Sequence, residues 1–352
     1  MFSFMRDTVC FDDVLLVPQY SDIESRTEVD LSVPGLFDDL NKMEAIGKRQ
    51  LTCPIVGSPM DTVMGPDSAQ ILSLLGGFGV LHRYCSIEDA CKSYTETMSA
   101  HGSQTNVMVA IGATGDYLER AAELFDVGCR SFCIDVAHGH HISVKRALES
   151  LRLKFGDKVH LMGGNVATLD AFNDLSDWGC DSIRTGVGGG SMCTTRIQTG
   201  HGVPTLQSIM DCARTDRKAK IVADGGIRNS GDAVKALAAG ADYIMLGSVL
   251  AGHQESPGII FNNPEGKFKA FRGMASKEAQ IDWRGKVGGE EGVSTFIPYK
   301  GLLRDTLEGF LAGMRSGLSY SGARNIPELQ RKAVFVGVSS NAVKENHPHG
   351  KN

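Results

Sequence analysis

Short apolar segments rich in β-branched residues recur eight times between residues 54 and 246, each followed by a turn containing Gly, Asp or Asn. They begin about 22 to 28 residues apart, except for one longer gap between the sixth and the seventh. Continuous apolar runs of this length are typical of strands buried on both faces of a parallel sheet. We therefore predict strands at 54–57, 79–81, 107–111, 131–135, 159–163, 182–185, 221–224 and 243–246.

The segments between these runs have amphipathic helical patterns. They predict helices at 68–75, 87–100, 117–125, 144–155, 169–178, 205–215 and 230–239, with closing helices near 303–314 and 326–331. Eight strand–helix units predict a closed (β/α)8 barrel, the TIM barrel, and an open doubly wound sheet is the alternative. We expect residues 1–352 to form a single barrel domain. A Gly-rich active-site excursion is expected at 252–300, after the eighth strand, and a disordered tail at 341–352.

Charge and cysteine content narrow the class of protein. The 36 Lys and Arg against 41 Asp and Glu give a net charge of −5 without a basic block, which argues against nucleic-acid binding. The nine cysteines are odd in number and have no CxxC spacing, as in a reduced protein without a disulfide framework or zinc site. With no signal-peptide pattern and no long apolar run, the expectation is a cytoplasmic protein outside the membrane.

Two Gly-rich segments, DGGIRNSGD at 224–232 and GSVLAG at 247–252, follow the last two predicted strands. Backbone N–H groups in such turns bind phosphate groups, and TIM barrels commonly bind phosphate after strands seven and eight. The alternative is that the glycines only permit tight turns. Asp224 ends the seventh strand, where it could accept both hydroxyls of a ribose or could cap the following helix.

The segment Gly186–Arg196, GVGGGSMCTTR, follows the sixth predicted strand. Its glycines could turn their carbonyl groups toward a monovalent cation. Cys193 lies in the loop instead of in a strand, so it is a candidate nucleophile for attack on an electrophilic ring carbon. The alternative is a flexible loop without a chemical role.

The loop DVAHGHH contains three closely spaced histidines, His138, His140 and His141. Three ligands within four residues cannot all face one ion, so we expect solvated side chains. The chain has no GxGxxG motif after a strand and no Walker lysine, so a dinucleotide would need an extended groove.

Several longer motifs occur in the order found in one enzyme family. They are FDDVLLVP from Phe11, GSPMDTV, GGNVAT, GGGSMCTTR, ADGGIRNSGD, MLGS, RGMAS, EGV with IPYKG, and SGLSYSGA ending at Ala323. On these motifs the chain resembles the IMP dehydrogenase / GMP reductase family over nearly its whole length. The resemblance implies a (β/α)8 barrel, typically assembled as a homotetramer, that binds a purine mononucleotide.

The resemblance also implies roles for individual residues. Cys193 would attack C2 of the purine to give a covalent adduct, and Thr195 with Glu291 would carry protons. The substrate residues implied are Ser58, Met60, Ser191, Asp224, Gly226, Gly247, Ser248, Gly273, Met274 and Ala275, with the phosphate on Ser191, Gly226, Gly247 and Ser248 and the ribose on Asp224. Asp135, Ala137 and Asn165 would line the nicotinamide side. The carbonyl groups of Gly188, Gly190 and Cys193 would bind potassium.

The family contains two reactions, and the motifs are mixed between them. IMP dehydrogenases usually insert regulatory CBS modules near residue 100 and carry a long flap with an Arg-Tyr pair. This chain has neither: about sixteen residues separate RGM from Glu291, and Trp283-Arg284 is the nearest feature to such a pair. Phe271 before RGM and the AGHQES stretch are also reductase-like. The segments DVAHGH, ADGGIR, ESPG and VPQYS are instead dehydrogenase-like.

Losing ammonia from C2 requires the adduct and the Thr195–Glu291 pair, whereas hydrolysing the adduct requires a base and a closing flap. The sequence therefore favours NADPH-dependent reductive deamination of GMP to IMP and ammonia. The alternative is an IMP dehydrogenase without CBS modules, which converts IMP, NAD+ and water to XMP and NADH. A non-catalytic nucleotide-binding relative is disfavoured, because binding alone would not require Cys193, Thr195 and Glu291 together.

Overall fold

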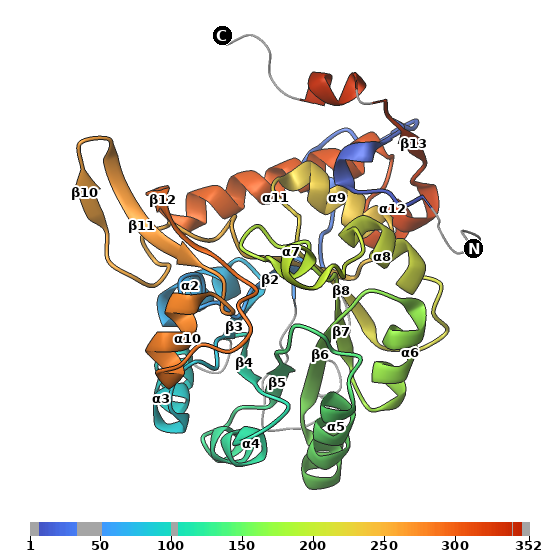
Figure 1. Ribbon diagram of the computed structural model, residues 1–352. Coiled ribbons are helices and arrows are strands. Elements are labelled where there is room, and N and C mark those ends of the chain that lie inside the picture. Colours follow the sequence, from blue (N-terminus) through green and yellow to red (C-terminus); the bar gives the residue numbers. More distant parts are fainter. Residues whose placement is uncertain (1–6, 34–50, 100–104, 340, 347–352) are drawn as a thin grey trace.

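All eight predicted apolar runs form strands of one closed parallel barrel (Figure 1). The computed structural model describes residues 7–33, 51–99, 105–339 and 341–346. The barrel strands are β2 (Ile55–Gly57), β3 (Phe78–Leu81), β4 (Val107–Ile111), β5 (Ser131–Ile134), β6 (His160–Val166), β7 (Ser182–Thr185), β8 (Lys220–Asp224) and β9 (Tyr243–Leu246). β9 pairs with β2, Ile244 lying opposite Ile55, which closes the sheet and excludes the open doubly wound alternative.

Helices surround the barrel at the predicted places (Figure 1). They are α2 (Pro66–Leu74), α3 (Ile87–Ser99), α4 (Tyr117–Asp126), α5 (Ile142–Phe155), α6 (Leu169–Asp177), α8 (Thr205–Cys212), α9 (Ser230–Ala238), α11 (Leu303–Tyr320) and α12 (Ile326–Lys332). Side-chain caps define several starts, such as Thr168 before α6 and Asn229 before α9. α11 runs six residues beyond its predicted end, and Ala100, the predicted end of α3, lies outside the described residues.

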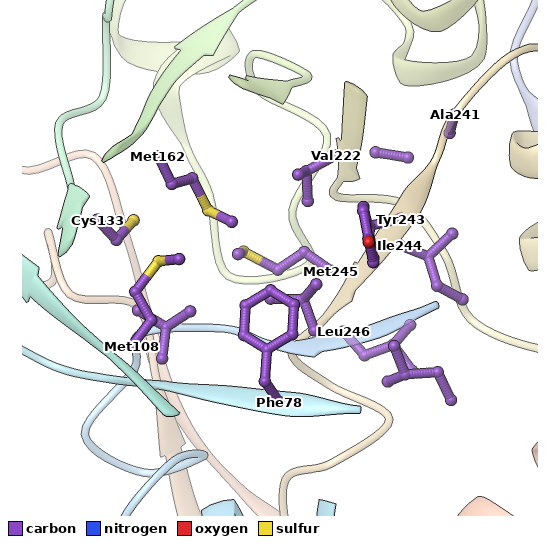
Figure 2. Packing of buried hydrophobic residues seen from close by; sticks show 14 of the residues in the cluster. Phe78, Met108, Cys133, Met162, Val222, Ala241, Tyr243, Ile244, Met245 and Leu246 are labelled. Carbon is purple, nitrogen blue, oxygen red and sulfur yellow. The ribbon is translucent and has the colours of Figure 1, made fainter. Parts of the chain in front are cut away.

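The interior of the barrel is filled by side chains (Figure 2). Met108 of β4, Met162 of β6 and Met245 of β9 extend into the same region, with exposed fractions of 2% or less. Phe78 and Tyr243 pack beside them in an edge-to-face contact with ring centroids 6.2 Å apart. Burying one such side chain stabilises the fold by roughly 1.5–3 kcal/mol. Since side chains fill the barrel, we expect the chemistry in the loops at its rim, where barrels of this kind have their active sites.

The excursion has regular structure that the sequence did not predict. β10 (Phe261–Asn263), β11 (Gly266–Arg272) and β12 (Ser294–Pro298) form an antiparallel sheet, and α10 (Lys277–Arg284) lies between β11 and β12 in sequence. Figure 1 shows this unit beside the barrel, and Trp283 of α10 stacks on Tyr84 in the loop after β3.

The two ends of the described chain also meet. β1 (Val14–Leu16) pairs with β13 (Phe335–Gly337) in an antiparallel ladder. Short 3-10 helices occur at Phe11–Asp13, Arg26–Glu28, Gly156–Lys158 and Ala342–Asn346. The last of these lies within the tail predicted to be disordered, whereas residues 347–352 lie outside the described part of the chain. Among the helices described, none is long and apolar enough to span a bilayer.

Candidate active site

The loop after β7 and the end of the excursion run side by side at the rim of the barrel. Cys193 pairs with Gly292 in an isolated antiparallel bridge. Thr194 N donates to Glu291 O at 2.9 Å, and Val293 N donates to Met192 O at 3.0 Å. Segments almost a hundred residues apart in sequence are thus joined by backbone hydrogen bonds.

This pairing brings the three predicted catalytic residues into one hydrogen-bonded chain. The Cys193 thiol donates to Thr195 Oγ1 at 3.1 Å, and the Thr195 hydroxyl donates to Glu291 Oε2 at 2.6 Å. Thr195 begins the short helix α7 (Thr195–Thr199) and is only 9% exposed. A proton leaving the thiol therefore has a direct route through a hydroxyl to a carboxylate.

Cys193 differs from the buried cysteines in its surroundings. Burial raises the pKa of Cys53 to about 11 and those of Cys133 and Cys212 to about 12, and it raises the pKa of Cys180 further. Cys193 lies on a half-exposed loop beside a hydroxyl. Since the thiolate is the nucleophile, the thiols inside the core are inert by comparison.

The two Gly-rich loops touch where a phosphate is predicted to bind. Gly225 has φ +97°, and a Cβ there would lie 3.0 Å from Gly189 C and Gly190 N, so only glycine allows this approach. A cavity of about 300 Å³ adjoins the contact and is lined by Ser191, Gly226 and Ser248 among others. Three of the four predicted phosphate residues thus line one cavity, and the fourth, Gly247, is not among its lining residues.

The remaining predicted nucleotide residues lie at the neighbouring strand ends. A Cβ on Gly247 would meet Met60 Sδ at 3.4 Å and Ser58 Cβ at 3.8 Å, so the loops after β2 and β9 are in contact. Ser58 N donates to Leu246 O at 3.0 Å. These contacts continue the rim from the phosphate cavity toward the place predicted for the base.

The RGMAS segment lies between this rim and the catalytic loop. Asp61 N donates to the sulfur of Met274 at 3.3 Å, and Gly273 N donates to Val293 O at 3.0 Å. Ala275 O accepts from Glu291 N at 3.2 Å. Gly273 and Ala275 therefore bond to the segment that carries Glu291, whereas Met274 contacts the loop after β2.

Asp224, at the end of β8, lies in a network of side chains. Asn165 Nδ2 donates to its Oδ2 at 2.8 Å, and Arg184 Nη1 lies 3.6 Å from the same oxygen. Burial raises the pKa of the Asp224 carboxyl above its usual value, although Arg184 and Asn165 oppose this shift. The cap of α9 is Asn229, so the interpretation of Asp224 as a helix cap is wrong.

Arg184 on β7 is the residue of this network that the sequence analysis missed. It is 3% exposed, and its Nη2 donates to Asp135 Oδ1 at 2.8 Å. Arg184 Nε is buried and has no hydrogen-bond partner among the described residues. A single charged residue within the apolar run 182–185 was the available signal, because an arginine is seldom buried without a partner.

The three residues predicted for the nicotinamide side come together at the ends of β5 and β6. Arg83 Nε lies 3.8 Å from Asp135 Oδ2 and donates to the Asp135 carbonyl at 3.2 Å. Asn165 N donates to Val136 O at 3.2 Å, which brings Asn165 beside the exposed Ala137. Through Arg184 this group is linked directly to Asp224.

The loop predicted to bind potassium contains a turn at Gly188. Gly188 has φ +77°, and a Cβ there would lie 2.7 Å from Arg196 Cγ, so the turn requires glycine. Gly190 O accepts from Cys193 N at 3.1 Å, which leaves one lone pair for a further partner. Backbone carbonyl oxygens are the ligands that potassium prefers in proteins.

The three loop histidines are all exposed. His140 Nε2 lies 2.8 Å from Asp174 Oδ2, and His141 Nδ1 caps α5 by accepting from Ser143 N. Within the described ranges, no cluster of three or more His, Cys, Asp or Glu is arranged to hold a metal ion.

Comparisons with known proteins agree with this geometry. The sequence matches the IMP dehydrogenase / GMP reductase domain over residues 8–349. It is 30% identical to inosine-5'-monophosphate dehydrogenase of Nitrosopumilus maritimus, with 98% of each chain covered. It is 37% identical to the enzyme of the same name from Halalkalibacterium halodurans, with 89% of this chain and 67% of the relative covered.

Among solved structures, the fold is similar to a variant of GMP reductase from Trypanosoma brucei in complex with guanosine 5'-monophosphate. The TM-score is 0.88 and the sequence identity 26%, and 99% of each chain is covered. The closed barrel, the catalytic chain at its rim and these matches lead to one assignment: the chain belongs to the IMP dehydrogenase / GMP reductase family of oxidoreductases.

Proposed function

We propose that this protein is a GMP reductase, which converts GMP, NADPH and two protons to IMP, NADP+ and an ammonium ion. The observation that carries the proposal is the hydrogen-bonded chain from Cys193 through Thr195 to Glu291. Similarity to a reductase structure that holds guanosine 5'-monophosphate supports the same substrate class. A nucleotide-binding relative without activity would not need a thiol, a hydroxyl and a carboxylate in this order.

The barrel loops would position the nucleotide. Its phosphate would lie in the cavity lined by Ser191, Gly226 and Ser248, where backbone N–H groups can donate to it. Asp224 would accept hydrogen bonds from the two ribose hydroxyls. With the phosphate and the ribose bound at the rim, C2 of the base would lie at the catalytic loop. The Cys193 thiol and C2 would then react within one complex, at a high effective concentration.

Proton transfer would follow the observed hydrogen bonds. The Cys193 thiol passes its proton to Thr195 as the hydroxyl proton of Thr195 moves to Glu291, and the thiolate adds to C2 of the purine. Glu291 then returns a proton through Thr195 to the 2-amino group. The C2–N bond breaks, ammonia leaves, and the base stays attached to Cys193. Addition of hydride to C2 and loss of the sulfur would release IMP and free the thiolate.

The residues at β5 and β6 fit a nicotinamide cofactor. Arg184 Nε is an unpartnered buried donor beside Asp135, and a carboxamide oxygen could accept its hydrogen bond. Asp135, Ala137 and Asn165 would hold the cofactor at this edge. When bound, the cofactor supplies the hydride, and the proposed form is NADPH.

IMP dehydrogenase is the second candidate, because the sequence relatives cited above carry that name. That reaction hydrolyses the covalent adduct and needs a base for water. Arg284 is the arginine of this segment that could serve as a flap base. Its guanidinium, however, bonds to Gln280 Oε1 and donates to Lys286 O at 3.3 Å. An arginine bonded within its own segment supports the reductase over the dehydrogenase.

Steady-state assays of the purified protein test this choice. Loss of absorbance of the reduced nicotinamide with GMP and NADPH, together with release of ammonia, is the expected result. Formation of NADH and XMP from IMP and NAD+, with no reaction of GMP, would instead assign the dehydrogenase. Substituting NADH for NADPH in the first assay tests the cofactor, and light scattering tests the proposed homotetramer.

We further propose that the carbonyl groups of Gly188, Gly190 and Cys193 bind potassium. The cation would hold the catalytic loop in the conformation that presents Cys193. Turnover should then rise when sodium is replaced by potassium at constant ionic strength. Equal rates in the two salts would show that the loop acts without a cation.

A further inference from the structure

Gln280, a buried residue of α10, joins the parts of the segment that carries Glu291. It is 2% exposed, although glutamine is usually found at the surface. Its Nε2 donates to Ala275 O and to Gly289 O, both at 3.0 Å. Its Oε1 accepts from Gly288 N at 2.8 Å and also from the guanidinium of Arg284. Both donors and both acceptor positions of the amide are therefore used.

These partners surround Glu291 along the chain. Gly288 and Gly289 lie just before it, and Ala275 O, which accepts from Gln280, also accepts from Glu291 N at 3.2 Å. Gly288 and Gly289 carry no side chains, and the Gln280 amide bonds to the backbone of both. It adds to the backbone hydrogen bonds that hold Glu291 itself, from Glu291 N to Ala275 O and from Thr194 N to Glu291 O.

α10 is also attached to the barrel, through the loops after β2 and β3. Arg272 bonds Asp61, in the loop after β2, and its Nη1 lies 2.6 Å from Asp282 of α10. Trp283 stacks on Tyr84, in the loop after β3, with ring centroids 4.2 Å apart and an interplanar angle of 16°. Gln280 thus connects a helix anchored on two barrel loops to the glycines that precede Glu291.

We propose that Gln280 is a positioning residue, which sets the place of the Glu291 carboxylate relative to Thr195 and Cys193. The segment 275–291 then acts as a fixed arm instead of a flap that opens and closes. This inference rests on the proposed function for its turnover assay, but not for its assay of the thiol. Gln280 touches neither Thr195 nor Cys193 in the structure, so its effect passes through Glu291.

Two substitutions and a matched control test the proposal. Gln280→Met removes all four hydrogen bonds at similar length, and Gln280→Glu keeps the shape and acceptors but loses both donors at neutral pH. In either variant kcat should fall about 10- to 100-fold, the effect of a misplaced catalytic group, while KM for GMP stays within about threefold. The control is Gln70→Met, because Gln70 Nε2 also donates to two carbonyl oxygens, those of Glu96 and Thr97, away from the site. It should leave kcat unchanged.

A second measurement does not depend on the reaction. The rate at which iodoacetamide alkylates Cys193, followed against pH by peptide mass spectrometry, reports how strongly Glu291 is coupled to the thiol. We expect the profiles of both Gln280 variants to move from that of the native protein toward that of Glu291→Gln. If the native protein fails to reduce GMP, this profile still decides the role of Gln280.

Unchanged kcat and an unchanged alkylation profile in a folded Gln280 variant would overturn the proposal. A parallel loss of kcat, GMP affinity and melting temperature, matched by Gln70→Met, would overturn it as well, since it would show general destabilisation. If Gln280→Met does not fold, Gln280→Glu retains the volume and half of the hydrogen bonds, and the same outcomes apply to it.

Discussion

The two sides of the catalytic centre are held by different means. Cys193 and Thr195 follow barrel strand β7. This strand pairs with β6 on one side and with β8 on the other. Glu291 lies on the excursion, which is held by backbone hydrogen bonds to the catalytic loop and by contacts of Arg272, Gln280 and Trp283. A group carried by a closed barrel tolerates local substitutions, whereas a group carried by an anchored arm depends on its anchors. We therefore expect the proposed nucleophile, Cys193, to tolerate changes around it better than the proposed proton carrier, Glu291.

The same contrast bears on the two reactions of the family. In the proposed mechanism, nucleotide binding and attack on C2 use the barrel side, which both reactions would need. The fate of the adduct, loss of ammonia or hydrolysis, would then be decided by the groups that the excursion supplies. Variation within residues 252–300 can therefore change the reaction without changing the fold.

Removing the proposed nucleophile on the barrel side of the site should have the largest effect on turnover. Cys193→Ala should abolish turnover, since no other group can form the adduct, while the Kd for GMP stays within about tenfold, or roughly 1.4 kcal/mol. Steady-state kinetics and calorimetric titration with GMP measure the two effects. In the native protein, bound GMP should protect Cys193 from alkylation more than it protects the other eight cysteines. Near-normal turnover of the variant would disprove covalent catalysis.

Removing the carboxylate breaks the excursion side. Glu291→Gln keeps the shape but cannot take the proton from Thr195, so deamination should fall on the order of 10²- to 10⁴-fold, the usual contribution of a general acid–base group. Ammonia release under saturating GMP and NADPH measures this loss, and GMP binding serves as the control. A fall of less than about threefold would show that protons reach the leaving group by another route.

Titration of Asp224 tests the barrel side more finely. Because burial raises its pKa, the carboxyl becomes protonated on acidification at a higher pH than an ordinary aspartate, and it then accepts the ribose hydroxyls less well. GMP affinity of the native protein should weaken as the pH falls toward that raised pKa. Asp224→Asn should bind GMP about tenfold or more weakly with little dependence on pH, as expected for loss of a charged acceptor. If the GMP affinity of the native protein did not change with pH, Asp224 would not be the residue that binds the ribose.

The raised pKa of Asp224 affects folding stability in the direction opposite to its effect on GMP affinity. A folded-state pKa above the unfolded value makes protonated Asp224 favourable to folding below the ordinary pKa of about 3.9, and this contribution is lost as the pH rises through the raised pKa. Above that raised pKa the ionised carboxylate costs stability. Asp224→Asn should therefore raise the melting temperature of the ligand-free protein at a pH where Asp224 is ionised, which differential scanning calorimetry can measure.

Arg284 gives the smallest expected effect and sharpens the choice between the two reactions. Arg284→Ala removes one of the two acceptor contacts of Gln280 and leaves the contact from Gly288 N. Reduction of GMP should stay within about threefold, because no acid–base step is assigned to Arg284. If the substitution instead removed an activity with IMP and NAD+, and GMP with NADPH gave no signal in any variant, the segment would be a shortened hydrolytic flap.

Much of the site could be predicted before the structure, and the omissions have a common cause. Glycine spacing, the loop position of Cys193 and the strand end at Asp224 are local features, and motif resemblance supplied Thr195 and Glu291. Arg184 escaped because it is a polar residue within an ordinary strand pattern, and Gln280 because its helix was not predicted. Their proposed roles come from sets of partners that include residues 9 and 49 positions away, such as Gly289 and Asp135, which a local pattern does not encode.

The sequence by itself determined the number and order of the barrel strands, since apolar runs of strand length and helical periodicity depend on neighbours a few residues away. The tertiary structure alone decided that β9 closes onto β2, that β1 pairs with β13, and that the excursion forms a sheet with its own helix. It also decided that Glu291 meets Thr195 across 96 residues of sequence. Contacts of that kind form only when the whole chain packs, because their free energy comes from burial and hydrogen bonding between segments that are independent in the unfolded chain.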